Sequence, residues 1–146
     1  MKRRVLTVLG GVAASTLLTI GTASAATEID TADAAGWPGG AFTPTCASTD
    51  EVQGCFRPDG EWFSILDREA DGHSAVIVWR LVNNEEVVRN GSIWHTAGAN
   101  PPVWRYQNKS FPEHYIVEFK VCIGEASNHD VWSDTCSPYE QRWTSS

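Results

Sequence analysis

Residues 73–82 run His-Ser-Ala-Val-Ile-Val-Trp-Arg-Leu-Val, and this stretch decides the fold class. In an extended chain, one of its two faces carries the apolar residues Ala75, Ile77, Trp79 and Leu81. The opposite face is also largely apolar near its middle, which is typical of a strand that is covered on both sides. The stretch therefore predicts a central β-strand.

Turn residues flank this strand and recur along the chain at intervals of about ten residues. Asn83-Asn84 predicts a turn before the next strand, and Pro58-Asp59-Gly60 predicts a turn before an earlier one. Beyond residue 25, no segment has the apolar spacing of an amphipathic helix. We expect strands over residues 62–66, 73–82, 86–94, 103–107, 114–123 and 139–143. This pattern predicts an all-β fold, either an antiparallel β-sandwich or a small barrel.

Residues 1–25 have the composition of a secretory signal peptide. Residues 2–4 are basic, residues 5–22 are uncharged and mostly apolar, and Ala23-Ser24-Ala25 has the small side chains that a signal peptidase accepts. A membrane anchor is the alternative, but the apolar stretch is near the lower length limit for a span and is diluted by glycine. We therefore expect a bacterial protein that is cleaved after Ala25 and secreted.

The part that follows has the length of one domain, because cleavage after Ala25 leaves 121 residues. Residues 26–44 are rich in Ala, Thr, Asp, Gly and Pro, and predict a disordered, flexible leader. Residues 45–146 hold the expected strands and all four cysteines. They predict a disulfide-braced β domain that is monomeric.

The four cysteines predict a disulfide framework, because an even number of cysteines in a small exported protein is normally paired. Three pairings are possible, and the simplest joins neighbours: Cys46 with Cys55, and Cys122 with Cys136. Each bond would close a short loop and stabilise the fold by about 3 kcal/mol in the chain-entropy model. A zinc site is the competing use of four cysteines, but the chain has no Cys-x-x-Cys pair.

The charge of the exported part excludes one class of function. Without the three cations of residues 2–4, eight basic residues remain against 18 acidic ones, which gives a net charge of −10. Such a surface repels nucleic acid and anionic membranes, and no run of basic residues offsets it. We therefore expect no nucleic-acid binding, and no membrane contact once the signal peptide is removed.

Most of residues 61–137 resembles a pattern in small secreted actinobacterial proteins of uncharacterised function. The segments that carry the resemblance are Ile65-Leu66-Asp67, residues 71–79, Asn90-Gly91, Ala97-Gly98-Ala99, residues 117–122 and Cys136-Ser137. Family members have additional cysteines near the positions of Gly91 and Gly98, which this chain lacks. The resemblance implies an exported β domain and assigns no site residues.

One acidic segment matches the start of a calcium-binding loop. Asp67, Glu69 and Asp71, followed by Gly72, occupy the first ligand positions of an EF-hand-like loop. The twelfth position should be a bidentate glutamate and is Val78 instead. A plain acidic turn is therefore the favoured interpretation, with a metal site as the alternative, and we expect no cofactor.

Seven tryptophans are the most unusual feature of the composition. Trp79 is expected in the core, whereas Trp104 and Trp132 lie in segments that we interpret as loops. An indole exposed on a rigid scaffold can anchor a protein or stack on a sugar ring. We therefore select Trp104, Arg105, Tyr106 and Trp132 as candidate binding residues.

The triplet Trp104-Arg105-Tyr106 also resembles the Trp-Arg-Tyr motif of small secreted actinobacterial α-amylase inhibitors. In that family the motif lies on a protruding turn, with the arginine between the two aromatic rings. The cysteine spacing of this chain does not follow that family. The resemblance implies an inhibitor of a secreted hydrolase as an alternative function.

Nothing in the sequence nominates a catalytic group. The chain has no Gly-x-Ser-x-Gly motif, and its four histidines do not show the spacing of metal ligands. We therefore expect a non-catalytic binding protein whose partner is an extracellular protein or a polysaccharide. A small secreted hydrolase is the remaining alternative.

Overall fold

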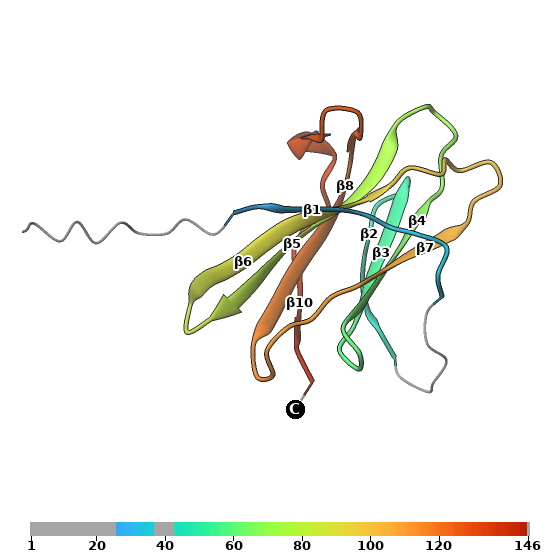
Figure 1. The fold of residues 1–146 in the computed structure, drawn as a ribbon. Coiled ribbons are helices and arrows are strands. Elements are labelled where there is room, and N and C mark those ends of the chain that lie inside the picture. Colours follow the sequence, from blue (N-terminus) through green and yellow to red (C-terminus); the bar gives the residue numbers. More distant parts are fainter. Residues whose placement is uncertain (1–25, 37–42, 146) are drawn as a thin grey trace, which may run out of the picture.

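A computed structural model describes residues 26–36 and 43–145, which form two packed β-sheets (Figure 1). The fold is all-β, as the sequence predicts, and one of the sheets is curled. The expected signal peptide and Trp37 lie outside the described residues. Within the described part of the chain, no helix is long and apolar enough to cross a membrane.

The first sheet has six strands in the order β1–β6–β5–β8–β10, with β9 beside β8. The neighbours are antiparallel, except that β1 is parallel to β6. As the sequence predicts, the 73–82 segment is a central strand. The strands are β1 (Glu28–Thr31), β5 (Ser74–Asn83), β6 (Glu86–His95), β8 (Ile116–Glu125), β9 (Asp130–Val131) and β10 (Glu140–Trp143).

The second sheet has four antiparallel strands in the order β2–β3–β4–β7. A single 3₁₀ turn, η1 (Ser133–Thr135), follows β9. The strands of this sheet are β2 (Thr45–Ser48), β3 (Val52–Arg57), β4 (Trp62–Asp67) and β7 (Trp104–Asn108).

The core lies between the two sheets and is filled largely by aromatic rings. Phe63 of β4 contacts Phe119 of β8 edge to face, with 5.9 Å between the ring centroids. Trp79 of β5 is fully buried, and its ring lies 5.2 Å from that of Phe111. Each core strand points alternate residues inward, which explains why one row of each strand is apolar.

The N-terminal strand β1 connects the two sheets at one edge. After β1, the Ala32 amide donates a hydrogen bond to the Trp94 carbonyl, and Asp33 pairs with Tyr106 of β7. The blue ribbon in Figure 1 passes from one sheet to the other. The flexible leader expected over residues 26–44 is therefore wrong for residues 28–33, because backbone pairing with β6 and β7 orders them.

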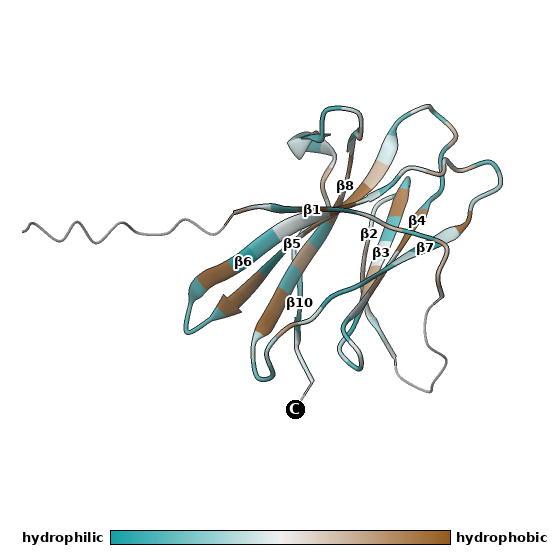
Figure 2. Cartoon of the chain, in the orientation of Figure 1, coloured by the Kyte–Doolittle hydropathy of each residue, from teal (hydrophilic) through white to brown (hydrophobic). Residues whose placement is uncertain are grey.

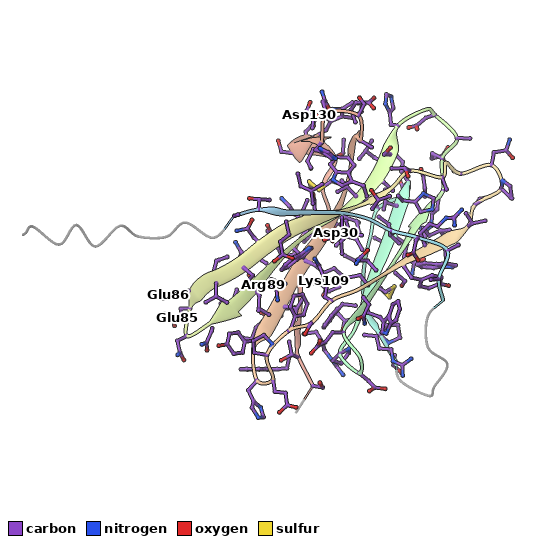
Figure 3. The ribbon with its side chains drawn as sticks, viewed as in Figure 1. Asp30, Glu85, Glu86, Arg89, Lys109 and Asp130 are labelled. Carbon is purple, nitrogen blue, oxygen red and sulfur yellow. A yellow bond between two sulfur atoms is a disulfide. The ribbon has the colours of Figure 1, made fainter. Side chains whose placement is uncertain are left out.

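Four charged side chains fix β1 in place beneath this edge. The Lys109 ammonium lies 2.8 Å from Glu28 Oε2 and 2.5 Å from Asp30 Oδ2, and Arg89 Nε lies 2.8 Å from Glu28 Oε1. Figure 3 shows Asp30, Arg89 and Lys109 close together. Lys109 is only 6 % exposed, and its ammonium lies 4.8 Å from the centre of the Trp79 ring. The hydrogen bond from Arg89, with that from Lys109, holds the pKa of Glu28 below its usual value.

Both predicted disulfides are present, and they account for all four cysteines. Cys46–Cys55 joins directly opposed residues of β2 and β3. Cys122–Cys136 ties the segment after β8 to the outer side of the six-stranded sheet, where it covers Val76 and Trp94. Two such bonds indicate folding in an oxidising compartment.

The close approach of the two sheets at Gly54 gives a prediction for stability. A Cβ atom at Gly54 would lie 2.6 Å from Val121 Cγ1 and 2.8 Å from Ile77 Cγ1. We expect Gly54→Ala to lower the free energy of unfolding by about 2 kcal/mol, because the core would have to separate or repack. Urea denaturation measures this, with Gly36→Ala as the control, since nothing lies within 4 Å of that position. If Gly54→Ala and Gly36→Ala have the same free energy of unfolding, the two sheets can accommodate a methyl group at Gly54 without loss of stability.

The ion cluster gives a second prediction. We expect Lys109→Met to lower the free energy of unfolding by about 2 kcal/mol near neutral pH, because Asp30 loses its cation in a partly buried place. The loss should shrink as the pH falls through the lowered pKa of Glu28, because protonated Glu28 is no longer attracted to the Lys109 ammonium. Thermal unfolding at several pH values measures this, with exposed Arg142→Met as the control. A deficit that is independent of pH would indicate lost packing on Trp79 instead.

Candidate functional site

The Trp104-Arg105-Tyr106 triplet lies within β7 and not on a protruding turn. Trp104 is paired with Leu66, and Tyr106 with Ser64, so both rings lie on the outer side of the four-stranded sheet. Arg105 is paired with the core residue Ile65 and points to the opposite side. The strand therefore separates the arginine from the two rings, which corrects the arrangement that the resemblance to amylase inhibitors implies.

Trp104 and Tyr106 border a shallow groove of 380 Å³ on that outer side. The first disulfide forms part of its floor. The lining residues are Pro44, Cys46, Gln53, Cys55, Ser64, Trp104 and Tyr106. The structure therefore brings together two of the four predicted binding residues.

Trp132 lies elsewhere and is not an exposed loop anchor. It immediately precedes η1 and is half-buried, with its side chain packed against the main core. Its ring also contacts that of His73, at 4.5 Å between centroids. Packing of the segment after β8 uses this indole, and a binding role for Trp132 stays a prediction.

The predicted calcium ligands do not converge. Asp67 is buried at the end of β4 and accepts a hydrogen bond from the Glu69 amide, whereas Glu69 and Asp71 are exposed. Asp71 accepts a hydrogen bond from the His73 amide, as in an ordinary turn. Among residues 26–36 and 43–145, no group of three His, Cys, Asp or Glu side chains is placed to hold a metal ion. The plain acidic turn is the interpretation that the geometry supports.

Asp67 and His95 are nevertheless two buried titratable groups at one end of the core. Asp67 is 2 % exposed, and its Oδ2 atom has no hydrogen-bond partner among the described residues. Desolvation raises the pKa of Asp67, although the Glu69 amide and His95 oppose this. His95 is fully buried and donates from Nε2 to the Val103 carbonyl oxygen, 2.8 Å away. Neither group lines the recesses of 620, 380, 420 and 220 Å³ on the described surface.

The outer side of the six-stranded sheet is the most unusual surface of the molecule. The segment that Cys136 ties down covers one part of it, around Val76. The remainder has three rows of side chains, here named the open face, which are half-buried or exposed except for the buried Ser92. The top row holds Ile29, Ser92, Val78, Lys120 and Tyr139. The middle row holds Asn90, Arg80, Glu118 and Gln141, and the bottom row holds Val87, Val82, Ile116 and Trp143.

All the large hydrophobic side chains that are exposed in the described chain lie on the open face or directly beside it. Trp143 is 60 % exposed, Ile29 52 %, Val87 46 % and Tyr139 41 %, and the fifth, Val88, occupies the β-bulge beside Val87. Figure 2 shows the hydrophobic colour at the free end of the β5–β6 hairpin and at the start of β8. An apolar patch of this kind marks an interaction surface.

The polar groups of the open face are ordered by contacts with one another. Arg80 forms an ion pair with Glu118 across β5 and β8, and its guanidinium lies 4.4 Å from the centre of the Tyr139 ring. The Lys120 ammonium lies 5.0 Å from the same ring. These contacts hold the tyrosine against the sheet before any partner binds.

Two hollows border the open face. A groove of 420 Å³ runs between β1, β5 and β6, with Ile29, Val78 and Asn90 in its lining. A second hollow of 620 Å³ lies at the end of β10, beside Trp143 and the turn at Pro58-Asp59. The first recess reaches the centre of the open face, since Arg80 and Tyr139 also line it, and the second lies at the end of the open face. Both could accept side chains of a partner.

None of the candidate binding or metal-ligating residues chosen from the sequence lies on the open face. The usable signal was the alternation of Tyr139, Gln141 and Trp143 in the last strand, which places both rings on one side. The sequence does not show that this side faces solvent, because that depends on which segment covers the sheet.

Comparison of the chain with protein-family models, curated proteins and solved structures finds no match. The resemblance to actinobacterial secreted proteins therefore stays a prediction, and the geometry alone carries the argument about function.

The buried carboxyl of Asp67 gives a prediction about pH. Because the pKa of Asp67 is raised on folding, the wild type loses stability as the pH rises from the ordinary aspartate pKa through the raised value. We expect Asp67→Asn to raise the free energy of unfolding by about 1 kcal/mol near neutral pH, and to make no difference in acid. Urea denaturation across this range measures the effect, with exposed Asp134→Asn as the control. A variant that is less stable than wild type at neutral pH would show that the carboxylate is stabilising.

Proposed function

We propose that the chain is a non-catalytic binding protein that is secreted and engages another protein through the open face. The observation that carries the proposal is the gathering of the exposed large hydrophobic side chains on this one surface. The paired cysteines support an extracellular site of action, because such bonds persist in oxidising compartments.

The composition of the open face favours a protein partner over a polysaccharide. Its bottom row is mainly β-branched, and Val82, Val87 and Ile116 have no ring on which a sugar could stack. Protein interfaces combine such an apolar region with aromatic anchors and a few ordered charged groups. The partner should therefore present an apolar band beside a band of paired polar groups.

The two aromatic rings have different roles in this proposal. Trp143 is the more exposed ring and lies beside the larger hollow, so it can bury the most area on binding. Tyr139 is already held by Arg80 and Lys120, which reduces the entropy that it loses in a complex.

Affinity capture with the immobilised protein tests the proposal. Extracellular proteins of the source bacterium are passed over wild type, Trp143→Ala and the groove variant Trp104→Ala, and any retained protein is purified for calorimetry. We expect a partner to bind wild type and Trp104→Ala alike, and Trp143→Ala about 30-fold more weakly, which corresponds to an interface hot spot. Thermal unfolding should show that Trp143→Ala is as stable as wild type, because the ring is exposed. If the retained protein binds Trp143→Ala like wild type but does not bind Trp104→Ala, the binding site lies on the outer side of the four-stranded sheet.

A further inference from the structure

We infer that the partner of the open face is a second copy of this chain, bound face to face about a two-fold axis. The axis would run along the strands between β5 and β8, at the centre of the three rows. This inference rests on the proposed function, since it names the occupant of the same surface. A two-fold interface must be complementary to itself, and the open face has this property.

The middle row shows the self-complementarity most directly. In order across the sheet it reads amide, cation, anion, amide: Asn90, Arg80, Glu118 and Gln141. Rotation about the axis reverses this order, so Arg80 of one copy faces Glu118 of the other. The same rotation places Asn90 against Gln141, and two amides can donate and accept hydrogen bonds mutually. No charge in the row would be buried against a like charge.

The bottom row is also complementary to itself. Rotation places Trp143 of one copy against Val87 of the other, and Ile116 against Val82. The most exposed aromatic side chain of the open face thereby covers an exposed aliphatic one. Both are removed from water twice in the dimer, because a two-fold axis repeats every contact.

The top row adds aromatic and aliphatic contacts to the interface. Tyr139 would lie over Ile29 and the position of Ser92, whose buried hydroxyl already accepts a hydrogen bond from Trp94 Nε1. Lys120 would lie against Val78 while its ammonium stays on the Tyr139 ring. The segment tied down by Cys136 limits the interface above this row.

The net charge predicts how the dimer responds to salt. Each exported copy has eight basic and 18 acidic residues, so two copies repel each other at low ionic strength. Figure 3 places Glu85 and Glu86 at the turn of the β5–β6 hairpin, at the margin of the open face. Salt screens such exposed charges and leaves the apolar contacts intact. Added salt should therefore strengthen the dimer, whereas it would weaken a complex with a basic protein.

Sedimentation of the purified wild-type protein at micromolar to millimolar concentrations tests the inference. We expect a reversible monomer–dimer equilibrium whose dissociation constant falls several-fold between low salt and about 0.5 M salt, where screening is nearly complete. A wild-type protein that remains monomeric at every concentration and salt level overturns the inference. Dimers that weaken with salt overturn it as well.

A pair of charge variants tests the register of the two copies. In a dimer of the Arg80→Glu variant, the two carboxylates at positions 80 and 118 of one copy would face the same two carboxylates of the other copy. In a dimer of the Glu118→Arg variant, four guanidiniums would meet in the same way. We expect each variant alone to lose at least tenfold in dimer affinity, and a mixture of the two to form a heterodimer, because every facing pair is then opposite in charge. Thr96→Lys, on the exposed loop after β6, is the control for an added charge and should dimerise like wild type.

The outcomes of these experiments separate the inference from the proposed function. If wild type dimerises but the mixture of the two charge variants stays monomeric, the proposed pairing of Arg80 with Glu118 across the axis is overturned. If Arg80→Glu fails to fold, Val87→Lys replaces it, because Val87 is exposed in the monomer and faces Trp143 in the dimer. A monomeric wild type that still captures a different protein through Trp143 overturns the dimer and leaves the proposed function standing.

Discussion

The structure depends on the unequal burial of the two sides of β5. Its inner row, which includes Ile77 and Trp79, is completely buried in the core between the two sheets. Its outer row is fully buried only at Val76, where the Cys122–Cys136 bond holds a segment over the sheet. One strand thus supplies the core of the fold and, further along its outer side, the open face. Because side chains alternate between the two sides of a strand, the residues of β5 that stabilise the core differ from those that form the open face.

The edge of the sandwich illustrates how an N-terminal segment of four residues becomes part of the domain. Parallel pairing of β1 with β6 requires Gly91, where a Cβ atom would lie 2.6 Å from the Glu28 carbonyl oxygen. The charges of Glu28 and Asp30 then meet Lys109 above the Trp79 ring. Burying these charges is tolerable because each has an opposite partner within hydrogen-bond distance. The covering of Trp79 therefore needs residues from three distant parts of the chain.

The contrast between β5 and β1 shows what could be predicted from the sequence. The strands over 73–82 and 114–123 and both disulfides follow from local patterns, namely alternation and the distance between cysteines. The strand β1 could not be predicted, because residues 28–31 have no apolar alternation and are ordered by pairing with β6. Trp104 and Tyr106 lie on the same side of β7 because they are two residues apart, but the position of Arg105 depends on which side of β7 faces the core. The open face was missed for the same reason, since exposure is a property of neighbours that the sequence does not identify.

The apolar character of the open face has no explanation in the stability of the monomer. The side chains of Val82, Val87 and Trp143 point away from the core, so polar residues at these positions would leave the packing between the sheets unchanged. The outer side of the four-stranded sheet shows this alternative in part, since it carries Ser48, Gln53 and Ser64 beside Leu66 and three aromatic rings. Exposed apolar rows cost solubility and favour non-specific association unless a specific partner covers them. A self-complementary partner resolves this conflict, because it buries the apolar rows of both copies in a closed pair.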